Sequence, residues 1–240
     1  MCLIALARRA SPIFPLVLAA NRDEDYERPT RDAHAWEDAP DVVGGTDALY
    51  GGSWLAVRRG GRFAAVTNLR GAARRTRSRG SLVRDFVTGE LAPAQYGEEI
   101  AKVAGEYAGF HLLAGDVGGD ILYIAPEGQR VLSDGVHAFS NAPYGEQWPK
   151  MGVAADALQH ALRIGDSGPL IDELLRFLST RRGTGSPESE VFLAGDRYGT
   201  RSSTVVVATP TGIVFAEQSY ARGGEAQGER RLFRFLQLNS

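Results

Sequence analysis

The sequence predicts an α+β fold in which two mainly antiparallel sheets stack face to face with helices outside. Short apolar runs occur in pairs joined by turn residues, which is typical of β-hairpins. These hairpins alternate along the chain with pairs of amphipathic helices. A sheet with two apolar faces must cover both, and two sheets with outer helices satisfy that need. The 240 residues contain no repeat and no linker, so one domain over 1–240 is expected.

The first hairpin joins the apolar runs 2–7 and 16–20 around a turn near Pro12. Neither run alternates, which predicts strands that are buried on both faces. Antiparallel pairing about this turn places residue 2 opposite residue 22, give or take one position. Cys2 is therefore expected beside Arg22 and Asp23, although a one-residue slip would turn the pair to the wrong face.

The later elements follow from the same two patterns. The stretch 25–43 is polar and contains prolines, so an irregular loop holding His34 and Trp36 is expected there. The stretch 180–190 is rich in Gly, Ser and Arg and is expected to be a mobile loop. Hairpins are expected at 54–57 with 63–68, 110–115 with 121–124 and 203–208 with 213–216, single strands before Asn141 and at 231–236, and helices at 81–87, 93–107, 150–163 and 169–179.

Composition narrows the class of protein. A net charge of −2 and a pI near 6.1 give no electrostatic basis for binding nucleic acid. The single cysteine excludes internal disulfides and cysteine-cluster metal sites. No window approaches the roughly 18 consecutive apolar residues of a transmembrane helix, and no signal peptide is recognised. A cytoplasmic location is therefore expected, with the oligomeric state left open.

Cys2 carries the chemistry that the sequence suggests. Removal of the initiator Met1 would give this residue a thiol and a free amine, whose reference pKa of about 7.7 to 8.0 suits a general base. Arg22 would favour the thiolate, and Asp23 would hold or orient the amine. A retained Met1 blocks the amine, and a cysteine at this position is also common as a small buried apolar residue.

A basic loop precedes the helix expected at 81–87. It contains Arg74, Arg75, Arg77 and Arg79. Such a loop beside a helix start can receive a carboxylate, a propionate or a phosphate. A solvated surface loop is the alternative interpretation.

Several motifs together resemble one family. Met1-Cys2 followed by Asn21-Arg22-Asp23-Glu24 resembles the NRDE family, also called the transport-and-Golgi-organisation family. The resemblance runs from residue 1 to about residue 220. It continues through Gly51-Gly52-Ser53-Trp54-Leu55, Thr67-Asn68-Leu69-Arg70, Ser78-Arg79-Gly80, Phe139-Ser140-Asn141-Ala142, Trp148-Pro149-Lys150 and Tyr198-Gly199-Thr200-Arg201-Ser202-Ser203-Thr204.

The resemblance implies an N-terminal nucleophile (Ntn) hydrolase-like fold, a four-layer αββα sandwich. It also implies a cysteine amidohydrolase, similar in layout to bile-salt hydrolases and penicillin V acylases, that cleaves the C–N bond of an acylated small molecule through an acyl-enzyme without a cofactor. Carried over by motif, Cys2 would be the nucleophile, Arg22 and Asp23 its thiol and amine partners, Asn68 and Asn141 oxyanion donors, and Arg201 an orienting charge. Asn21, Glu24, Trp54, Arg70 and Arg79 are expected to contact the ligand.

Two features of this assignment leave alternatives open. Other residues separate the charges that match Arg22 and Asp23 in those hydrolases, whereas here the two are adjacent. The two asparagines end expected strands, where Asn commonly caps a turn. Arg201 could instead form an ion pair with Asp196.

The resemblance also implies a second function, because family members are implicated in haem mobilisation and in lipid or acyl-CoA homeostasis. Haem would then be the ligand of a trafficking protein that keeps the scaffold without hydrolysis. A haem site needs apolar walls, cations for the propionates and usually an axial ligand. The chain offers Trp36, Trp54, the basic loop, Cys2, and four histidines that are also common as ordinary core or surface residues: His34, His111, His137 and His160.

Overall fold

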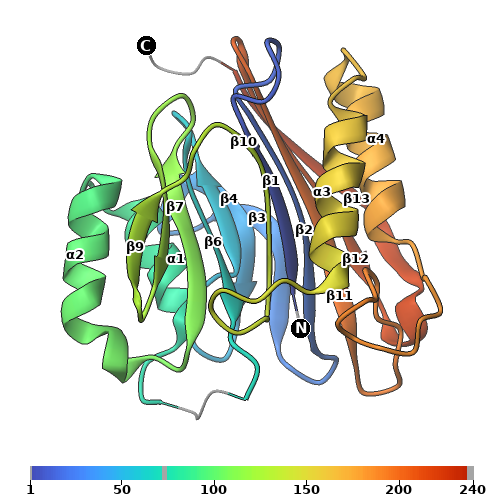
Figure 1. The fold of residues 1–240 in the computed structure, drawn as a ribbon, viewed down its shortest axis with the longest axis horizontal. Coiled ribbons are helices and arrows are strands. Elements are labelled where there is room, and N and C mark those ends of the chain that lie inside the picture. Colours follow the sequence, from blue (N-terminus) through green and yellow to red (C-terminus); the bar gives the residue numbers. More distant parts are fainter. Residues whose placement is uncertain (1, 72–74, 237–240) are drawn as a thin grey trace. The chain divides into compact units, whose positions relative to one another are not determined.

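A computed structural model describes residues 2–71 and 75–236 (Figure 1). Their contacts divide the described residues into two compact units. The first unit contains the residues up to 28 and residues 134–236, and the second contains residues 29–71 and 75–133. Each unit is one sheet with its own helices. The expectation of a single domain stays a prediction.

The first unit is a six-stranded sheet in the order β10-β1-β2-β11-β12-β13, with antiparallel pairing between all neighbours. Two helices, α3 and α4, lie side by side along one face of it (Figure 1). The bounds are β1 Leu3–Arg8, β2 Leu16–Asp25, β10 Gly135–Ser140, α3 Pro149–Ala161, α4 Ser167–Leu178, β11 Tyr198–Thr209, β12 Gly212–Tyr220, the short 3₁₀ helix Arg222–Gly224 and β13 Ala226–Leu236.

Both faces of the central hairpin are buried, as the unbroken apolar runs predict. Leu3, Ala5 and Ala7 of β1 contribute to the core that α3 and α4 complete. Ile4 and Leu6 point to the opposite face and are also buried, at 3% and 0% exposure. Because side chains alternate along a strand, this parity assigns each neighbouring polar residue to one face.

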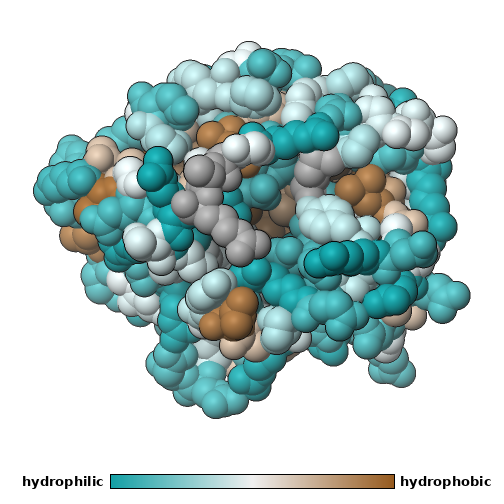
Figure 2. All heavy atoms as spheres, turned by 90° about the horizontal axis from the view of Figure 1, so that it is seen from below, coloured by the Kyte–Doolittle hydropathy of each residue, from teal (hydrophilic) through white to brown (hydrophobic). Residues whose placement is uncertain are grey.

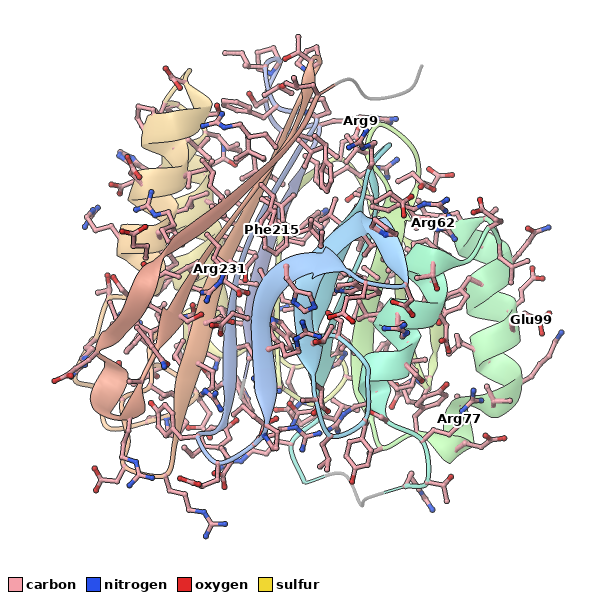
Figure 3. All side chains as sticks on the ribbon, turned by 180° about the vertical axis from the view of Figure 1, so that it is seen from behind. Arg9, Arg62, Arg77, Glu99, Phe215 and Arg231 are labelled. Atoms are coloured by element: carbon pink, nitrogen blue, oxygen red, sulfur yellow. The ribbon has the colours of Figure 1, made fainter. Side chains whose placement is uncertain are left out.

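The second unit is a seven-stranded antiparallel sheet in the order β3-β4-β5-β6-β7-β8-β9, with α1 and α2 packed on it. The guanidinium of Arg62, a residue labelled in Figure 3, lies 3.7 Å from the centroid of the Phe86 ring and donates to the Phe86 carbonyl near the end of α1. The bounds are β3 Thr30–Trp36, β4 Ala39–Asp47, β5 Leu55–Arg58, β6 Arg62–Asn68, α1 Arg79–Thr88, α2 Pro93–Val103, the 3₁₀ helix Ala104–Glu106, β7 Phe110–Asp116, β8 Ile121–Ala125 and β9 Gly128–Val131.

One sequence-based expectation about elements is wrong, one strand was missed and one helix ends earlier than expected. Most of the irregular loop expected at 25–43 is strand, because Trp36 is buried and its indole N–H donates to the Gly44 carbonyl across β3 and β4. The exposed strand β9 was not expected, since it has no apolar periodicity. The helix expected at 93–107 ends at Val103 and continues as a 3₁₀ turn.

The exposed residues are mainly polar on the face drawn in Figure 2. Hydrophilic residues cover most of that face, and hydrophobic residues appear there as small separate patches. Among the described residues, no helix combines the length and the apolar character needed to cross a membrane.

Candidate active site around Cys2

The register of the central hairpin brings Cys2 and Arg22 to the same end of the sheet. Leu3 pairs with Asn21, so the ladder continues outward to Cys2 opposite Arg22, the register expected from the sequence. On the other side of β1, Leu3 pairs with Ser140 of β10, which brings Asn141 next to Cys2. Three segments that are distant in the sequence therefore meet at the start of β1.

Cys2 is half-buried and its thiol is free. Its backbone N–H donates to Oδ1 of Asn141 in a short hydrogen bond. Burial and the charge of Asp23 raise the pKa of the Cys2 thiol, whereas the backbone N–H of Asp23 and the charge of Arg22 lower it. Burial is the largest of these effects, so the thiol pKa lies above its ordinary value.

Asp23 lies on the helix-facing side of β2 and is 5% exposed. The Thr200 hydroxyl donates to Oδ1 of Asp23 over 2.7 Å and itself accepts the backbone N–H of Leu193 over 2.9 Å. That second bond fixes the direction of the hydroxyl, so Oδ1 of Asp23 must be the acceptor. Burial raises the pKa of Asp23, and the Lys150 ammonium and the Thr200 hydrogen bond lower it.

Arg22 is 6% exposed and lies on the face opposite to Asp23. Its guanidinium is 3.7 Å from a carboxylate oxygen of Glu24, which Arg28 approaches to the same distance. Burial lowers the pKa of Arg22, while Glu24 and Cys2 raise it. Since an arginine stays protonated throughout the physiological range, Arg22 is a permanent cation on the Cys2 side of the sheet.

Arg201 supports the chain that follows β2. It lies at a register shift in β11, between Thr200 and Ser202. Its guanidinium donates to the backbone carbonyls of Asp25, Tyr26 and Arg28 over 3.0, 3.1 and 3.3 Å. It therefore holds the turn after the Asn21–Glu24 segment, rather than pairing with Asp196.

Asn21 is 1% exposed and makes hydrogen bonds with three elements of the first unit. Its Nδ2 donates to the carbonyls of Leu178 and Val191, each over 2.8 Å. Its Oδ1 accepts the Ser203 hydroxyl over 2.6 Å. These bonds join β2 to the end of α4, to the segment before β11 and to β11 itself.

Replacing this amide should destabilise the fold more than it changes any chemistry at Cys2. We expect Asn21→Ala to lower the free energy of unfolding by about 2 to 4 kcal/mol, because it leaves buried polar partners unpaired. Urea denaturation followed by circular dichroism measures the change. Gln227→Ala is the matched control, since its amide is exposed on β13 and its loss should cost no more than about 0.5 kcal/mol. Equal effects of the two substitutions would contradict this role for Asn21.

Other expected site residues belong to the second unit. Asn68 is the last residue of β6 and pairs with Phe110, and the Trp54 ring packs closely over Gly45. Arg79 begins α1 and donates to the Gly109 carbonyl over 3.4 Å, while Arg70 is exposed. The roles expected for these residues stay predictions.

The basic loop is only partly described, because Arg74, like Met1, lies outside the described residues. Arg77 is 3.4 Å from Glu106 and lies over the Tyr107 ring at 5.0 Å from its centroid. At least this arginine therefore has partners within its own unit.

Sequence reasoning did not assign a role to Lys150, Thr200 or Ser202. Lys150 is completely buried and interacts electrostatically with Asp23, and the Thr200 hydroxyl donates a hydrogen bond to the Asp23 carboxylate. Ser202 pairs with Arg22, is 3% exposed, and its hydroxyl has no hydrogen-bond partner among the described residues. The available signal was a lysine that interrupts the apolar face of an expected helix.

Comparison with known proteins identifies the family. A sequence model of the family described as Transport and Golgi organisation 2 matches residues 1–222. The chain belongs to the Transport and Golgi organisation 2 family. The NRDE resemblance stated from the sequence is therefore confirmed.

Two mammalian members of the Transport and Golgi organisation 2 family match over nearly their whole length. The Bos taurus Transport and Golgi organization protein 2 homolog is 31% identical, and the match covers 91% of this chain and 93% of that protein. The Homo sapiens homolog is 28% identical, with 98% and 99% covered.

Solved structures show which fold this member of the Transport and Golgi organisation 2 family has. A C2A mutant of conjugated bile acid hydrolase from Clostridium perfringens has a TM-score of 0.52 and 8% identity, covering 97% of this chain and 92% of that one. Penicillin V acylase from Agrobacterium tumefaciens has a TM-score of 0.53 and 11% identity, covering 91% and 83%. A Caenorhabditis elegans ortholog of N-acylethanolamine-hydrolyzing acid amidase has a TM-score of 0.51 and 13% identity, covering 86% and 92%. The Ntn-hydrolase-like α+β fold expected from the sequence is confirmed.

Proposed function

We propose that the protein is an N-terminal cysteine amidohydrolase that cleaves the C–N bond of an acylated small molecule. The observation that carries the proposal is the bond from the Cys2 nitrogen to Asn141, in a cluster that also holds Arg22 and Asp23. The names of the three similar structures support it, because they specify a conjugated bile acid, an N-acylethanolamine and penicillin V. Each of these molecules contains an acylated nitrogen.

Activation of the nucleophile begins with the removal of Met1. The nitrogen that Asn141 binds then becomes an α-amine, whose ordinary pKa is near neutrality. In its neutral form this amine takes the proton of the Cys2 thiol, and the thiolate remains beside Arg22. The buried Asp23 carboxylate holds the protonated amine by charge.

Acylation and deacylation then follow as two balanced steps. The thiolate sulfur attacks the amide carbonyl carbon, the C–N bond breaks, and the leaving amine takes the proton from the Cys2 ammonium. This leaves an acyl thioester on Cys2. The Cys2 amine next takes a proton from water, the resulting hydroxide attacks the thioester, and the products are a carboxylic acid and the free thiol.

Asn141 has two tasks in this scheme. Its Oδ1 accepts from the Cys2 nitrogen, so its Nδ2 is the atom that would donate to the oxyanion. The role of Asn68 as a second donor, expected from the sequence, stays a prediction.

We expect Asn141→Leu to lower turnover of a linear acyl amide by about 10² to 10³, the usual loss for one oxyanion donor. Release of the amine from chromogenic N-acyl substrates of different chain length measures it. Gln227→Ala is the control and should keep wild-type turnover. Wild-type protein with processed Cys2 that releases no amine from any acyl amide would contradict the proposed function itself.

The alternative function, haem binding, stays a prediction. At least two of the four histidines already have partners, since Nδ1 of His34 is 2.7 Å from the Asp32 carbonyl and Nδ1 of His111 is 2.5 Å from the Tyr123 hydroxyl. His137 stacks on Phe139. A haemin titration of wild type and Cys2→Ala tests the alternative, because saturation near one equivalent in the Soret band would favour a carrier and a flat titration would count against it.

A further inference from the structure

Lys150 places an ammonium group inside the apolar face of α3. Its side chain is 0% exposed, and its Nζ has no hydrogen-bond partner among the described residues. The other buried residues of this helix, among them Met151, Ala154 and Leu158, are apolar. Burying an ammonium group without a hydrogen bond is strongly unfavourable. Packing of the helix therefore does not explain a lysine at this position.

The place of Lys150 in the helix is unfavourable for a second reason. It is the second residue of α3, and the positive end of a helix dipole repels cations. A stabilising contact comes from the Trp148 ring, whose centroid is 5.6 Å from Nζ, within the range of a cation–π interaction. Burial and helix position together disfavour this cation, so its compensation must come from charges in the site.

Helix α3 packs against β1, and two titratable groups among the described residues interact electrostatically with the ammonium: Asp23 from β2 and Cys2 from the start of β1. Burial lowers the pKa of Lys150, and the charges of Asp23 and Cys2 raise it. Asp23 is itself fixed by Thr200. The ammonium therefore acts on both groups through its field, without a hydrogen bond to either.

We propose that Lys150 is a positioning residue whose buried ammonium group sets the ionisation of the Cys2 site. The charge favours the Cys2 thiolate and keeps Asp23 ionised. After Met1 is removed, it also repels a proton from the Cys2 amine, so that the amine can act as a base. In all three cases the positive charge lowers the pKa of the group concerned. The purpose of these ionisations, amide cleavage, rests on the proposed function, whereas the effect of Lys150 on them does not.

The chain uses lysine here although nearly all its other cations are arginine. Of its 27 basic residues, only Lys102 and Lys150 are lysines. An arginine would bury five N–H donors, whereas a lysine is a compact point charge on a flexible stem. Lys102 is exposed on α2 and bonds to Glu99 over 2.6 Å, so it is the matched control for the charge itself.

The rate of Cys2 alkylation tests the proposal without any substrate. Cys2 is the only thiol in the chain, so iodoacetamide uptake by the full-length protein reports its thiolate fraction directly. For Lys150→Met we expect alkylation at pH 7.5 to slow roughly threefold to tenfold and its pH profile to move to higher pH, because a cation has been removed. The pH profile of alkylation for Lys102→Met should coincide with that of the wild type. Asp23→Asn should move the profile to lower pH, because an anion has been removed.

Each outcome decides for or against the proposal. Circular dichroism and thermal unfolding show whether the Lys150→Met variant is folded. If that variant does not fold, the Lys150→Gln variant is used in its place. A Lys150 variant that is folded but has the wild-type alkylation profile would overturn the proposal. Absence of amide turnover in the wild type would instead overturn the proposed function, since alkylation does not require the reaction.

Discussion

Cys2→Ser is expected to lower amide turnover by at least about 10⁴, because removal of a catalytic nucleophile leaves only binding and oxyanion stabilisation. The substitution changes one atom of a half-buried side chain, so the fold should be kept. Serine is a much weaker nucleophile at neutral pH, since its hydroxyl is essentially never ionised there. Amine release from the acyl-amide substrates, measured at equal protein concentration, gives the ratio.

Two controls separate loss of chemistry from loss of structure in this variant. Its thermal unfolding should match that of the wild type, and Lys102→Met should keep full turnover because Lys102 is exposed on α2. Turnover in Cys2→Ser within tenfold of the wild type would show that the reaction does not use this sulfur. The site around Cys2 would then need another function.

The second large effect concerns the free amine of Cys2. An arginine inserted between Met1 and Cys2 prevents exposure of that amine, because the initiator methionine is removed only before a small residue. We expect turnover to fall by about 10² to 10⁴, the usual contribution of a general base. Intact mass confirms the extra residues, and amine release gives the rate.

The thiol itself should survive this insertion. Iodoacetamide should still alkylate the cysteine, so the variant separates the role of the amine from that of the sulfur. Insertion of a small residue, alanine, after Cys2 is not equivalent, because it would leave β1 in register but displace Cys2 by one position and turn its side chain to the other face. An arginine-inserted protein with wild-type turnover would contradict amine-assisted catalysis, even if Cys2→Ser is inactive.

The central hairpin was predictable because its strands carry long apolar runs and a clear turn. Those features fixed the pairing of Leu3 with Asn21, and with it the meeting of Cys2 and Arg22. The strand at 30–36 was missed because its burial depends on partners in the sheet. Trp36 bonds to Gly44 across the ladder, while the surrounding residues are polar.

The charge arrangement behind Cys2 was not predictable from local pattern. Lys150 and Thr200 come from a helix and a strand far along the chain, and only the packing of α3 and β11 against β1 and β2 brings them to Asp23. Periodicity predicted the helix that carries Lys150, but it could not show which groups this lysine meets inside the fold. Asn21 and Arg201 were expected at the site, and the structure shows both making bonds that hold its framework.

The most direct test of the account is the intact mass of the protein, quenched with acid during turnover of an acyl amide. We expect a species that lacks Met1 and carries one acyl group on residue 2, absent from Cys2→Ser and from the arginine-inserted protein. A chain that keeps Met1, or one that lacks Met1 and carries no acyl group while amine is released, would contradict an acyl-enzyme on Cys2.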